Sequence, residues 1–310
     1  MHESVLMREV VDLLVVKQGG TYIDGTLGNG GHTRAIIERA GAKSFVMALD
    51  RDELALERAG KVLDVFRNQV CLVHGNFSEM AEVARSKGIN TVDGVLLDLG
   101  VSSEQLDEGC RGFSFMRDGP LDMRMDQQGN DMTAADLVNG LGENELCEIL
   151  IEFGEEKMAR RVVKAIARER EIEPIRTTGR LAGIVERAMG GRRGRVHPAT
   201  KTFQALRIKV NDELGSLKKG LEGGLSLLGM EGRMAVISFH SLEDRIVKRF
   251  FAGHSGKWES LQGGGAEWVG EKPRMQICTK KPIEASIAEM DRNPRARSAK
   301  LRVAEKSEMM

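Results

Sequence analysis

Aromatic residues make up only 4% of this 310-residue chain, which contains a single tyrosine and two tryptophans. So small a set is poorly suited to a broad platform on which nucleic-acid bases stack. Long apolar runs are missing too, because none approaches the ~18 consecutive residues of a membrane-spanning helix. The N-terminal stretch MHESVLMREVVDLL has acidic residues within its apolar part and lacks the layout of a signal peptide. We therefore expect a cytoplasmic protein without a membrane segment.

Cysteine is scarce as well. The four cysteines lie far apart in the sequence, at positions 71, 110, 147 and 278. They form no CxxC pair and lie near no histidine cluster, which argues against a structural zinc site. They are typical of reduced thiols in the cytoplasm, and we expect no bound metal.

The net charge is zero, with 46 basic and 46 acidic residues, but the charge is unevenly distributed. Residues 1–154 contain 14 Lys and Arg against 26 Asp and Glu, whereas residues 155–215 contain 15 against 8. Residues 271–310 are also basic, with 10 against 6. A polyanionic partner would bind these two basic segments rather than the molecule as a whole. Charge alone favours the plainer interpretation that Lys and Arg solvate helix faces.

Short apolar runs alternate with helical stretches between residues 21 and 99. The runs TYID, FVMALD, VCLVHG and GVLLDLG are rich in Val, Leu and Ile, which is typical of buried strands. The stretches HTRAIIERA, DELALERAGKVL and FSEMAEVARSKG have helical spacing, and a further helix is expected over residues 4–16. Strands that alternate with helices predict a parallel sheet built from βαβ units.

The alternation stops after residue 100. The segment CRGFSFMRDGPLDMRMDQQGN, residues 110–130, is punctuated by glycine and proline and predicts a long loop. Helices are expected over residues 133–153, 155–171, 178–189 and 198–214. Thr133 and Asp136 have the spacing of a capping box, and Pro198 suits a first helical turn. The inward side chains of the last helix would be Phe203, Leu206, Val210 and Leu214.

Sheet-like runs return at 232-GRMAVISF-239, 275-MQICTK-280 and 298-SAKLRVAE-305, with a glycine-rich surface loop expected over residues 253–272. The simplest architecture is a doubly wound α/β fold interrupted by a helical insertion. We expect residues 1–104 and 216–310 to form the two parts of one core. Residues 105–215 would form an inserted loop and helical domain.

The stretch 24-DGTLGNGGHTRAI-36 places four glycines within seven positions, directly after the first expected strand. Glycine has no Cβ, so such a loop lets the backbone approach a ligand closely. It is not a P-loop, because no lysine follows the glycines. It also lacks the dinucleotide fingerprint GxGxxG, because Thr33 stands at the third glycine position.

Three acids end expected strands near this loop: Asp24, Asp50 and Asp98. Asp50 lies 20 positions after Gly30, where an acid can accept hydrogen bonds from a ribose diol. Three carboxylates would repel a pyrophosphate but attract a cationic sulfonium. The loop therefore favours S-adenosylmethionine over a dinucleotide, although Asp24 or Asp98 taken singly also suits a turn or cap.

Longer motifs complete the pattern: 97-LDLGVSSEQLDEGCRGFSFMRDGPLDMRMD-126, 197-HPATKTFQALRIKVNDEL-214, 237-ISFHSLEDRIVKRFF-251 and 293-NPRARSAKLRVAE-305. Together with DGTLGNGGHT they resemble, over nearly the whole chain, the RsmH (MraW) family of bacterial 16S ribosomal RNA cytosine-N4 methyltransferases. The resemblance implies a Rossmann-like class I methyltransferase core with an inserted helical substrate-recognition domain. It also implies S-adenosylmethionine as methyl donor and a decoding-centre cytidine of 16S rRNA, near the ribosomal P site, as acceptor.

The resemblance also assigns residues to the donor site. The methionine part would be surrounded by Gly30, Gly31 and His32, the ribose held by Asp50 and the adenine covered by Phe77, with Asp98 and Gln105 completing the pocket. Two of these have plainer interpretations, Phe77 as a core residue and Gln105 as the partner of Ser102 in a capping box.

Methyl transfer from a sulfonium needs no metal, but the N4 lone pair of cytosine is delocalised into the ring. Positioning must therefore supply much of the catalysis, and the target base must leave its stack. After the fourth expected strand the chain has DLGVSS, where many amino-methylating enzymes carry [DNS]PP[YF]. Asp98, Ser102 with the backbone before it, and His240 are candidates for the missing role. His240 suits a structural turn equally well, and the sequence identifies no general base.

For RNA contact, the break between the expected inserted helices and the basic C-terminal segment offer Arg192, Arg193, Arg195, His197, Arg292, Arg295 and Arg297. Flexible arginines suit phosphates and stacked bases. Phe113 and Phe115 lie in the loop over residues 110–126. They are expected to pin this loop to the core rather than to hold a flipped base. With so few aromatics, recognition by shape of 16S rRNA within the assembled small subunit is expected. A homo-oligomer is compatible with the sequence.

Two other functions are compatible with parts of the sequence. A nicotinamide-dependent oxidoreductase would need the missing GxGxxG loop. A non-catalytic ribosome-assembly factor would retain the donor fold without turnover, although the intact glycines and acids argue against it. Stabilisation by S-adenosylhomocysteine but not by NAD, followed by a turnover assay, separates the three.

Overall fold

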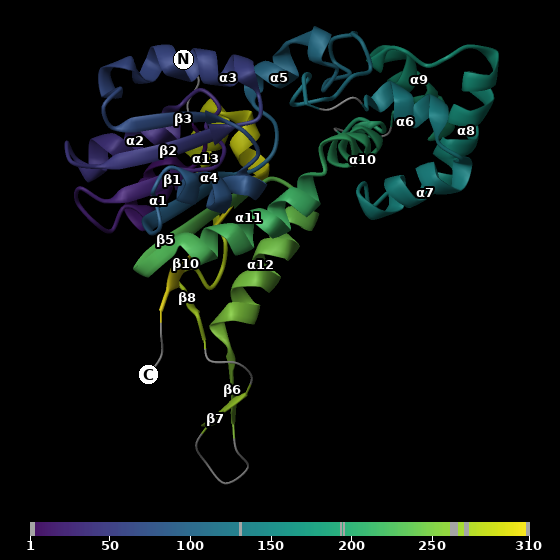
Figure 1. Ribbon diagram of the computed structural model, residues 1–310. Coiled ribbons are helices and arrows are strands. Elements are labelled where there is room, and N and C mark those ends of the chain that lie inside the picture. Colours follow the sequence, from purple (N-terminus) through teal and green to yellow (C-terminus); the bar gives the residue numbers. More distant parts are fainter. Residues whose placement is uncertain are drawn as a thin grey trace. The chain divides into compact units, whose positions relative to one another are not determined.

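The computed structural model describes residues 4–129, 132–192, 194, 196–260, 266–269 and 273–307. The chain folds into two compact units (Figure 1). One, which we call the core unit, comprises Met1–Gly100 and Gly215–Met310. The other, the inserted unit, comprises Val101–Leu214. In the described part of the chain, no helix is long and apolar enough to cross a membrane.

The core unit is built on an eight-stranded sheet with the order β3-β2-β1-β4-β5-β10-β8, in which β9 also pairs with β10. The strands are β1 Thr21–Asp24, β2 Phe45–Asp50, β3 Val70–His74, β4 Val92–Asp98, β5 Leu228–Ser238, β8 Met275–Ile277, β9 Ile283–Glu284 and β10 Lys300–Lys306. Strands β1 to β5 pair in parallel, whereas β10 is antiparallel to β5, β8 and β9. The strand order reverses between β1 and β4, and in such sheets ligands bind outside the carboxyl ends at that point.

Helices cover both faces of this sheet: α1 Met7–Leu14, α2 Gly31–Ala40, α3 Glu53–Leu63, α4 Met80–Ser86, α11 Glu213–Leu227, α12 Ser241–Ser255 and α13 Ile287–Arg292. Successive strand residues point to opposite faces. Tyr22 accordingly packs in a cluster with residues of α1, α2 and α3, and Ile23 in one with residues of α4, α11 and α12. Burial on both faces explains why the strands read as continuous apolar runs. The predicted α/β class, with a Rossmann-like core, is confirmed.

One expectation for the core unit is partly wrong. Residues 253–272 do not form only a loop, because β6 (Lys257–Ser260) pairs antiparallel with β7 (Ala266–Val269) after α12 ends at Ser255. In the sequence, two short runs that each contain a tryptophan flank a glycine-rich stretch, which is a hairpin pattern. The glycines between them led to the loop prediction.

The inserted unit is helical and has its own apolar core. Its helices are α5 Ser103–Asp107, α6 Ala134–Gly140, α7 Glu143–Glu152, α8 Ala159–Ile172, α9 Thr178–Ala188 and α10 Thr200–Asn211. Leu146, Val162, Leu181 and Leu206 are among the residues buried together between them. The capping box predicted for Thr133 and Asp136 is present at the start of α6.

The last inserted helix is shorter than expected at both ends. Pro198 lies before the helix, which starts at Thr200. Asp212 has left-handed backbone angles, φ 44° and ψ 45°, so α10 ends at Asn211 and Leu214 belongs to α11. Arg207 and Glu213 span this break with two hydrogen bonds of 2.8 Å between guanidinium and carboxylate. Such a bidentate pair stabilises the turn between the two helices.

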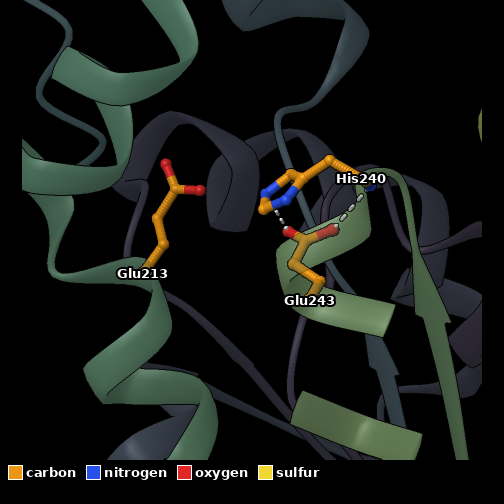
Figure 2. A group of neighbouring side chains, drawn as sticks. All are labelled: Glu213, His240 and Glu243. Atoms are coloured by element: carbon orange, nitrogen blue, oxygen red, sulfur yellow. Dashed lines mark hydrogen bonds and ion pairs between the residues drawn. The ribbon is translucent and has the colours of Figure 1, made fainter. Parts of the chain in front are cut away.

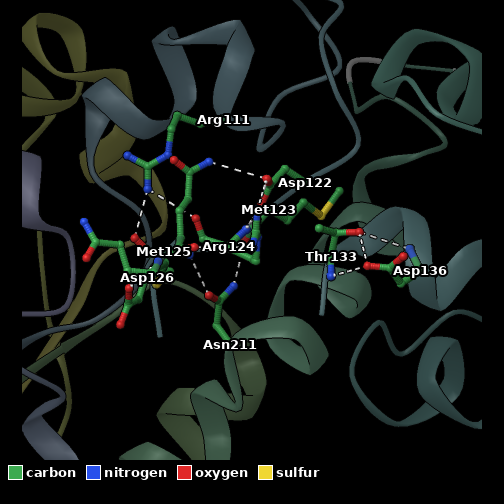
Figure 3. Close-up of polar contacts among 11 residues, drawn as sticks. Arg111, Asp122, Met123, Arg124, Met125, Asp126, Thr133, Asp136 and Asn211 are labelled. Carbon is green, nitrogen blue, oxygen red and sulfur yellow. Dashed lines mark hydrogen bonds and ion pairs between the residues drawn. The ribbon is translucent and has the colours of Figure 1, made fainter. Parts of the chain in front are cut away.

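The long loop before α6 is held by side chains of the inserted unit (Figure 3). The amide of Asn211 accepts a hydrogen bond from the Met125 backbone N–H and donates one to the Met123 carbonyl, both at 2.8 Å. Arg111, which is buried, donates from Nη2 to the Met125 carbonyl at 2.9 Å. These bonds satisfy buried backbone groups that a loop without strand partners would leave unpaired.

Phe113 and Phe115 add apolar anchors to the same loop. Phe113 is buried in the helical core, and the ring of Phe115 lies 4.5 Å from the His197 ring and 5.0 Å from the Phe203 ring. The prediction that these two phenylalanines pin the loop is confirmed.

Candidate donor-binding and catalytic site

Polar residues gather at the carboxyl ends of the central parallel strands. β1 ends at Asp24, β2 at Asp50 and β4 at Asp98. The pairing register places Asp98 opposite Ile237 of β5, so His240 follows β5 at the same edge of the sheet. The topology therefore brings together residues that are up to 216 positions apart in the sequence, counted from Asp24 to His240.

The glycine loop after β1 is tied to the end of β2. The Gly28 N–H donates to Oδ2 of Asp50 at 2.8 Å, and the Leu27 N–H donates to the Leu49 carbonyl at 2.8 Å. Gly28 and Gly30 have φ angles of 52° and 80°, in the left-handed region that favours glycine. A Cβ on Gly28 would meet nothing within 4 Å, so this backbone segment borders open space.

Asp50 is an electrostatically perturbed carboxylate at this edge. Its Oδ1 accepts from the Asp52 N–H at 2.9 Å, while Oδ2 accepts from Gly28. Burial raises the pKa of Asp50 to about 6 and outweighs these two hydrogen bonds, which lower the pKa. A carboxylate has about four lone-pair sites, so the two backbone bonds leave acceptor capacity for a ligand.

Phe77 lies against the start of the glycine loop. A Cβ on Gly25 would lie 2.9 Å from Cβ of Phe77 and 2.6 Å from Cδ2 of Leu97, which explains the glycine there. The Phe77 ring also packs against Gly220 of α11, where an added Cβ would lie 2.5 Å from Cδ2 of the ring. Phe77 is only partly buried, so it is a member of the core that also borders the loop.

Asp24 has a structural role that its sequence position left open. It is fully buried, accepts from the Thr33 hydroxyl at 2.7 Å and accepts from the Thr26 N–H at 3.1 Å. These bonds join the end of β1 to the first turn of α2. Burial raises the pKa of Asp24.

His32 and Asp98 face each other beside Asp24. Nε2 of His32 lies 3.5 Å from Oδ2 of Asp98, and the two side chains are 5% and 23% exposed. Burial alone would lower the pKa of His32, but attraction to the carboxylates of Asp98 and Asp24 outweighs it and the pKa is raised. Neither ring nitrogen of His32 nor Oδ1 of Asp98 has a hydrogen-bond partner among the described residues, although all three atoms are buried.

The N-terminus of α2 lacks a side-chain cap as well. Gly30 occupies the N-cap position and has no side chain to accept from the first-turn N–H groups. Backbone N–H groups at a helix N-terminus attract a carboxylate. The uncapped start of α2 and the buried atoms of His32 and Asp98 that lack hydrogen-bond partners suit the amino-acid end of a ligand. The remaining acceptor capacity of Asp50 suits a diol.

His240 follows β5 and begins α12, where Glu243 holds it (Figure 2). Oε1 of Glu243 lies 3.1 Å from Nε2 of His240, and the two side chains are 10% and 3% exposed. Oε2 of Glu243 accepts from the backbone N–H groups of Phe239, at 2.8 Å, and His240, at 3.2 Å. Both ring nitrogens of His240 are buried and neither has a hydrogen-bond partner in the described part of the chain, so the contact of Nε2 with Glu243 is an ion-pair contact rather than a hydrogen bond.

The first turn of α12 is held by an ion pair between Arg302 and Asp244. Arg302 of β10 donates from Nε to Oδ1 of Asp244 at 2.7 Å and from Nη2 to Oδ2 at 3.2 Å. Arg302 is 8% exposed, so this is a bidentate and largely buried ion pair. It ties the first turn of α12 to the sheet and so supports His240.

Two candidate residues lie in the inserted unit. Ser102 accepts from the Gln105 N–H at 3.2 Å, and Oε1 of Gln105 accepts from the Ser102 N–H at 3.0 Å. The pair forms the capping box of α5, which was the plainer interpretation of the sequence.

The residues predicted for RNA contact differ in their surroundings. Arg192 is exposed, whereas Arg193 and Arg195 lie outside the described residues. His197 is mostly buried: Nδ1 accepts from the Ala199 N–H at 3.1 Å and Nε2 lies 3.5 Å from Glu186. His197 therefore supports the turn before α10.

The C-terminal arginines lie around the short 3-10 helix Pro294–Ser298. Arg292 and Arg297 are exposed and Arg295 is partly buried. They belong to the core unit, whereas Arg192 belongs to the inserted unit.

Sequence reasoning missed two supporting residues. Glu243 was not singled out, although HSLE has the three-residue spacing of a capping box. Thr26 accepts from the Asp98 N–H through Oγ1 at 2.6 Å and so positions the end of β4. No local pattern identifies this contact, because it joins residues 72 positions apart.

Comparison with known proteins gives the family. The model of the MraW methylase family matches residues 1–307. The ribosomal RNA small subunit methyltransferase H of Syntrophotalea carbinolica is 50% identical over 97% of this chain and 96% of that protein. The protein of the same name from Geobacter sulfurreducens is 50% identical over 98% of both chains. Among solved structures, an rRNA methylase from Streptococcus thermophilus is similar with a TM-score of 0.43 and 10% identity, covering 99% of each chain. The family model and the sequence relatives carry the assignment: this chain belongs to the MraW methylase family.

Proposed function

We propose that this protein transfers a methyl group from S-adenosylmethionine to N4 of a cytidine in 16S rRNA, near the P site of the small ribosomal subunit. The relatives at 50% identity are named as methyltransferases of small-subunit ribosomal RNA. The observation that carries the proposal is the polar edge of the core unit, where Asp50, Asp98 and the uncapped α2 surround the glycine loop. The protein would act in the cytoplasm, where its substrate is assembled.

The residues present fit the donor. The carboxylate of Asp50 would accept from the ribose hydroxyls, and Phe77 would border the adenine beside the glycine loop. The N–H groups of Gly31 and His32 would hold the methionine carboxylate at the start of α2. Asp98, whose Oδ1 has no partner among the described residues, would attract the positively charged end. A contribution of Gln105 to this pocket stays a prediction of the family resemblance.

The donor supplies a methyl group activated by its sulfonium. N4 of cytidine attacks the methyl carbon, the N–C bond forms, and the C–S bond breaks with its electron pair going to sulfur. N4 then loses a proton. We assign its acceptor to Nδ1 of His240, because the Glu243 carboxylate lies 3.1 Å from Nε2 and would attract the ring hydrogen to that nitrogen, which would leave a lone pair on Nδ1.

In this proposal, His240 and the turn after β4 would together take the place of the missing [DNS]PP[YF] motif. Gly100 has a φ of 103° and an added Cβ there would lie 3.3 Å from the Phe239 ring, so the turns after β4 and β5 lie together. The acceptor amine would enter between Asp98, the last residue of β4, and His240, which follows the neighbouring β5. The inserted unit would recognise the RNA, with contacts from Arg192, Arg193 and Arg195, and with Arg295 contributing from the core unit.

Transfer of a labelled methyl group tests the function. The protein is incubated with labelled S-adenosylmethionine and small subunits that lack base methylation, with large subunits and free 16S rRNA in parallel. Label that enters only RNA of the small subunit supports the proposal, and a preference for subunits over free rRNA supports the assembled particle as substrate. Label in large-subunit RNA, or none in protein shown to bind the donor, would contradict it.

A further inference from the structure

The outward face of α8 carries four basic residues. The sequence analysis showed that residues 155–215 are basic but did not identify this face. Arg160, Arg161, Lys164 and Arg168 are all exposed. Residues 160, 164 and 168 are four apart and residue 161 lies beside them, so all four share one side of the helix. From residue 160 to residue 168 the helix rises by about 12 Å along its axis.

The opposite face of α8 is apolar and fixed. Ala159, Val162, Val163 and Ile166 are buried in the core of the inserted unit, where α8 contacts α7 and α9. In Figure 1, α8 lies at the edge of this unit between α7 and α9. The buried side sets the rotation of the helix, so the four basic side chains are held outward together.

Three other basic residues on or near α8 behave differently, because each has an acceptor. Arg170 donates to the Val138 carbonyl at 2.7 Å. Arg180 pairs with Glu173 at 2.7 Å, and Arg187 pairs with Glu169 at 3.2 Å. In contrast, the side chains of the four residues of the outward face have no ion-pair or hydrogen-bond partner in the part of the chain that the structure describes.

This arrangement disfavours the helix itself. The first turn of α8 contains no acid, and two arginines stand in it. Cations near a helix N-terminus oppose the macrodipole, and like charges four residues apart repel each other, each effect costing a few tenths of a kcal/mol or more. A local rule broken without a compensating contact is typical of a functional surface.

We propose that this face of α8 binds the phosphate backbone of the ribosomal RNA substrate. The inference rests on the proposed function and names the surface by which the inserted unit contacts RNA. Unpaired, exposed cations release counterions when they meet phosphates, and they carry no base specificity. Exposed Glu148 and Glu152 on neighbouring α7, and Glu171 near the C-terminal end of α8, would repel phosphates, so the proposed contact is limited to the stretch from Arg160 to Arg168.

The test is a variant in which all four residues become glutamine: Arg160→Gln, Arg161→Gln, Lys164→Gln and Arg168→Gln. Glutamine is a good helix former, so α8 is retained while four charges are removed. The matched control removes four exposed charges scattered over the core unit: Lys43→Gln, Lys61→Gln, Arg67→Gln and Lys87→Gln. Both variants are compared with the native protein for affinity to 16S rRNA and to small subunits at several salt concentrations.

The α8 variant is expected to bind both RNA and subunits at least ~10-fold more weakly, and the slope of log affinity against log salt is expected to fall by about three. Its affinity for S-adenosylhomocysteine and its circular dichroism should be unchanged, and its KM for subunits should rise at nearly constant kcat. The control should keep the native salt slope. An α8 variant with native affinity and slope would overturn the proposal.

Three further outcomes distinguish the kind of partner and separate this surface from the function. Weaker binding to subunits with native binding to naked 16S rRNA would overturn an RNA partner in favour of a ribosomal protein. Loss of RNA binding by the α8 variant, from a native protein that methylates no RNA, would support the surface and contradict the enzyme. Native methylation with an unaffected α8 variant would do the reverse.

Discussion

The carboxylate of Asp50 accepts the Gly28 N–H at 2.8 Å, so the acid that ends β2 also shapes the glycine loop after β1. One residue thus sets the loop conformation and keeps lone pairs for a ligand. The two roles respond differently to substitution. Asparagine at position 50 retains a carbonyl oxygen for the loop but loses the charge and one acceptor.

Asp50→Asn is therefore expected to weaken donor binding without unfolding the core unit. A hydrogen bond to a charged group contributes about 1.5–3 kcal/mol, so losing one lowers the affinity for S-adenosylhomocysteine by about 10- to 100-fold. Isothermal titration calorimetry measures this loss, and the thermal unfolding temperature of the ligand-free protein checks the fold. Native affinity in the variant would show that Asp50 does not hold the ribose.

Donor binding should also depend on pH through the same group. The pKa of Asp50 is raised to about 6 in the ligand-free protein, and its ionised form accepts more strongly from ribose hydroxyls than its protonated form does. The dissociation constant should therefore rise as the pH falls below about 6, by at most about tenfold per pH unit, and Asp50→Asn should lose this dependence. A native dissociation constant that stays flat between pH 7 and pH 5 would contradict the assignment.

The raised pKa of Asp50 affects folding stability in the opposite direction: acid pH weakens donor binding but favours the folded state of the ligand-free protein. Because the folded-state pKa lies above its ordinary value of 3.8, protonated Asp50 stabilises the ligand-free fold. This contribution is present below about pH 4 and is lost as the pH rises through about 6. Saturating donor should remove the loss, so the donor-induced rise in unfolding temperature should grow across this pH range.

Glycine at position 30 is expected to be required for the loop. An alanine there would have to adopt φ 80°, and its Cβ would lie 3.1 Å from Cδ1 of Leu63. Gly30→Ala should cost about 1–3 kcal/mol of unfolding free energy and weaken donor binding. Gly60→Ala is the control, because Gly60 lies within α3 and an added Cβ there would be 3.6 Å from its nearest atom, Cδ1 of Leu72. Alanine at this position should stabilise the helix by up to about 1 kcal/mol. Equal effects of both changes, in urea unfolding, would be inconsistent with strain at Gly30.

Glu243→Gln tests the tautomer of His240. The glutamine oxygen can still accept from the Phe239 and His240 N–H groups, while its amide N–H₂ would donate to Nε2 of the imidazole. Hydrogen would then move to Nδ1, which could no longer accept a proton, so kcat should fall by about 10²-fold or more. KM for subunits, donor affinity and the unfolding temperature should change little. A native kcat, or a loss that merely follows unfolding, would refute a proton-accepting role.

The Arg302–Asp244 pair should matter for stability. Replacing Arg302 by methionine leaves a largely buried carboxylate unpaired, which costs about 3–5 kcal/mol. The exposed pair Arg34–Glu38, whose side chains are 56% and 50% exposed, should contribute less than about 1 kcal/mol. Urea unfolding measures the free energy of unfolding of Arg302→Met and of Arg34→Met. Similar losses of unfolding free energy in the two variants would contradict a larger contribution from the buried pair.

Much of the core unit could be predicted from the sequence because its structure is local. Buried parallel strands read as apolar runs, and turn residues separate them from helices with clear periodicity.

In the inserted unit, the capping boxes at Thr133 and Ser102 follow from spacing alone. The prediction of which α10 side chains point inward was correct as far as Val210. The left-handed backbone of Asp212, which ends the helix, corresponds to no strong sequence pattern.

The functional edge was harder to predict, because it depends on contacts between distant strands. Asp50 and the glycine loop could be found from their order along the chain. The partnership of Thr26 with Asp98 could not, and the pairing of Glu243 with His240 was hidden within an ordinary helix start. The unpaired face of α8 looked like any solvated helix until the partners of its neighbours were known.

The most direct test of the central claim is nucleoside mass spectrometry of small-subunit RNA after incubation with S-adenosylmethionine and either the native protein or Asp50→Ala. We predict N4-methylcytidine with the native protein and little or none with the variant at limiting donor. A different methylated nucleoside would contradict cytidine N4 as the acceptor, and equal amounts with both proteins would contradict Asp50 as the ribose ligand.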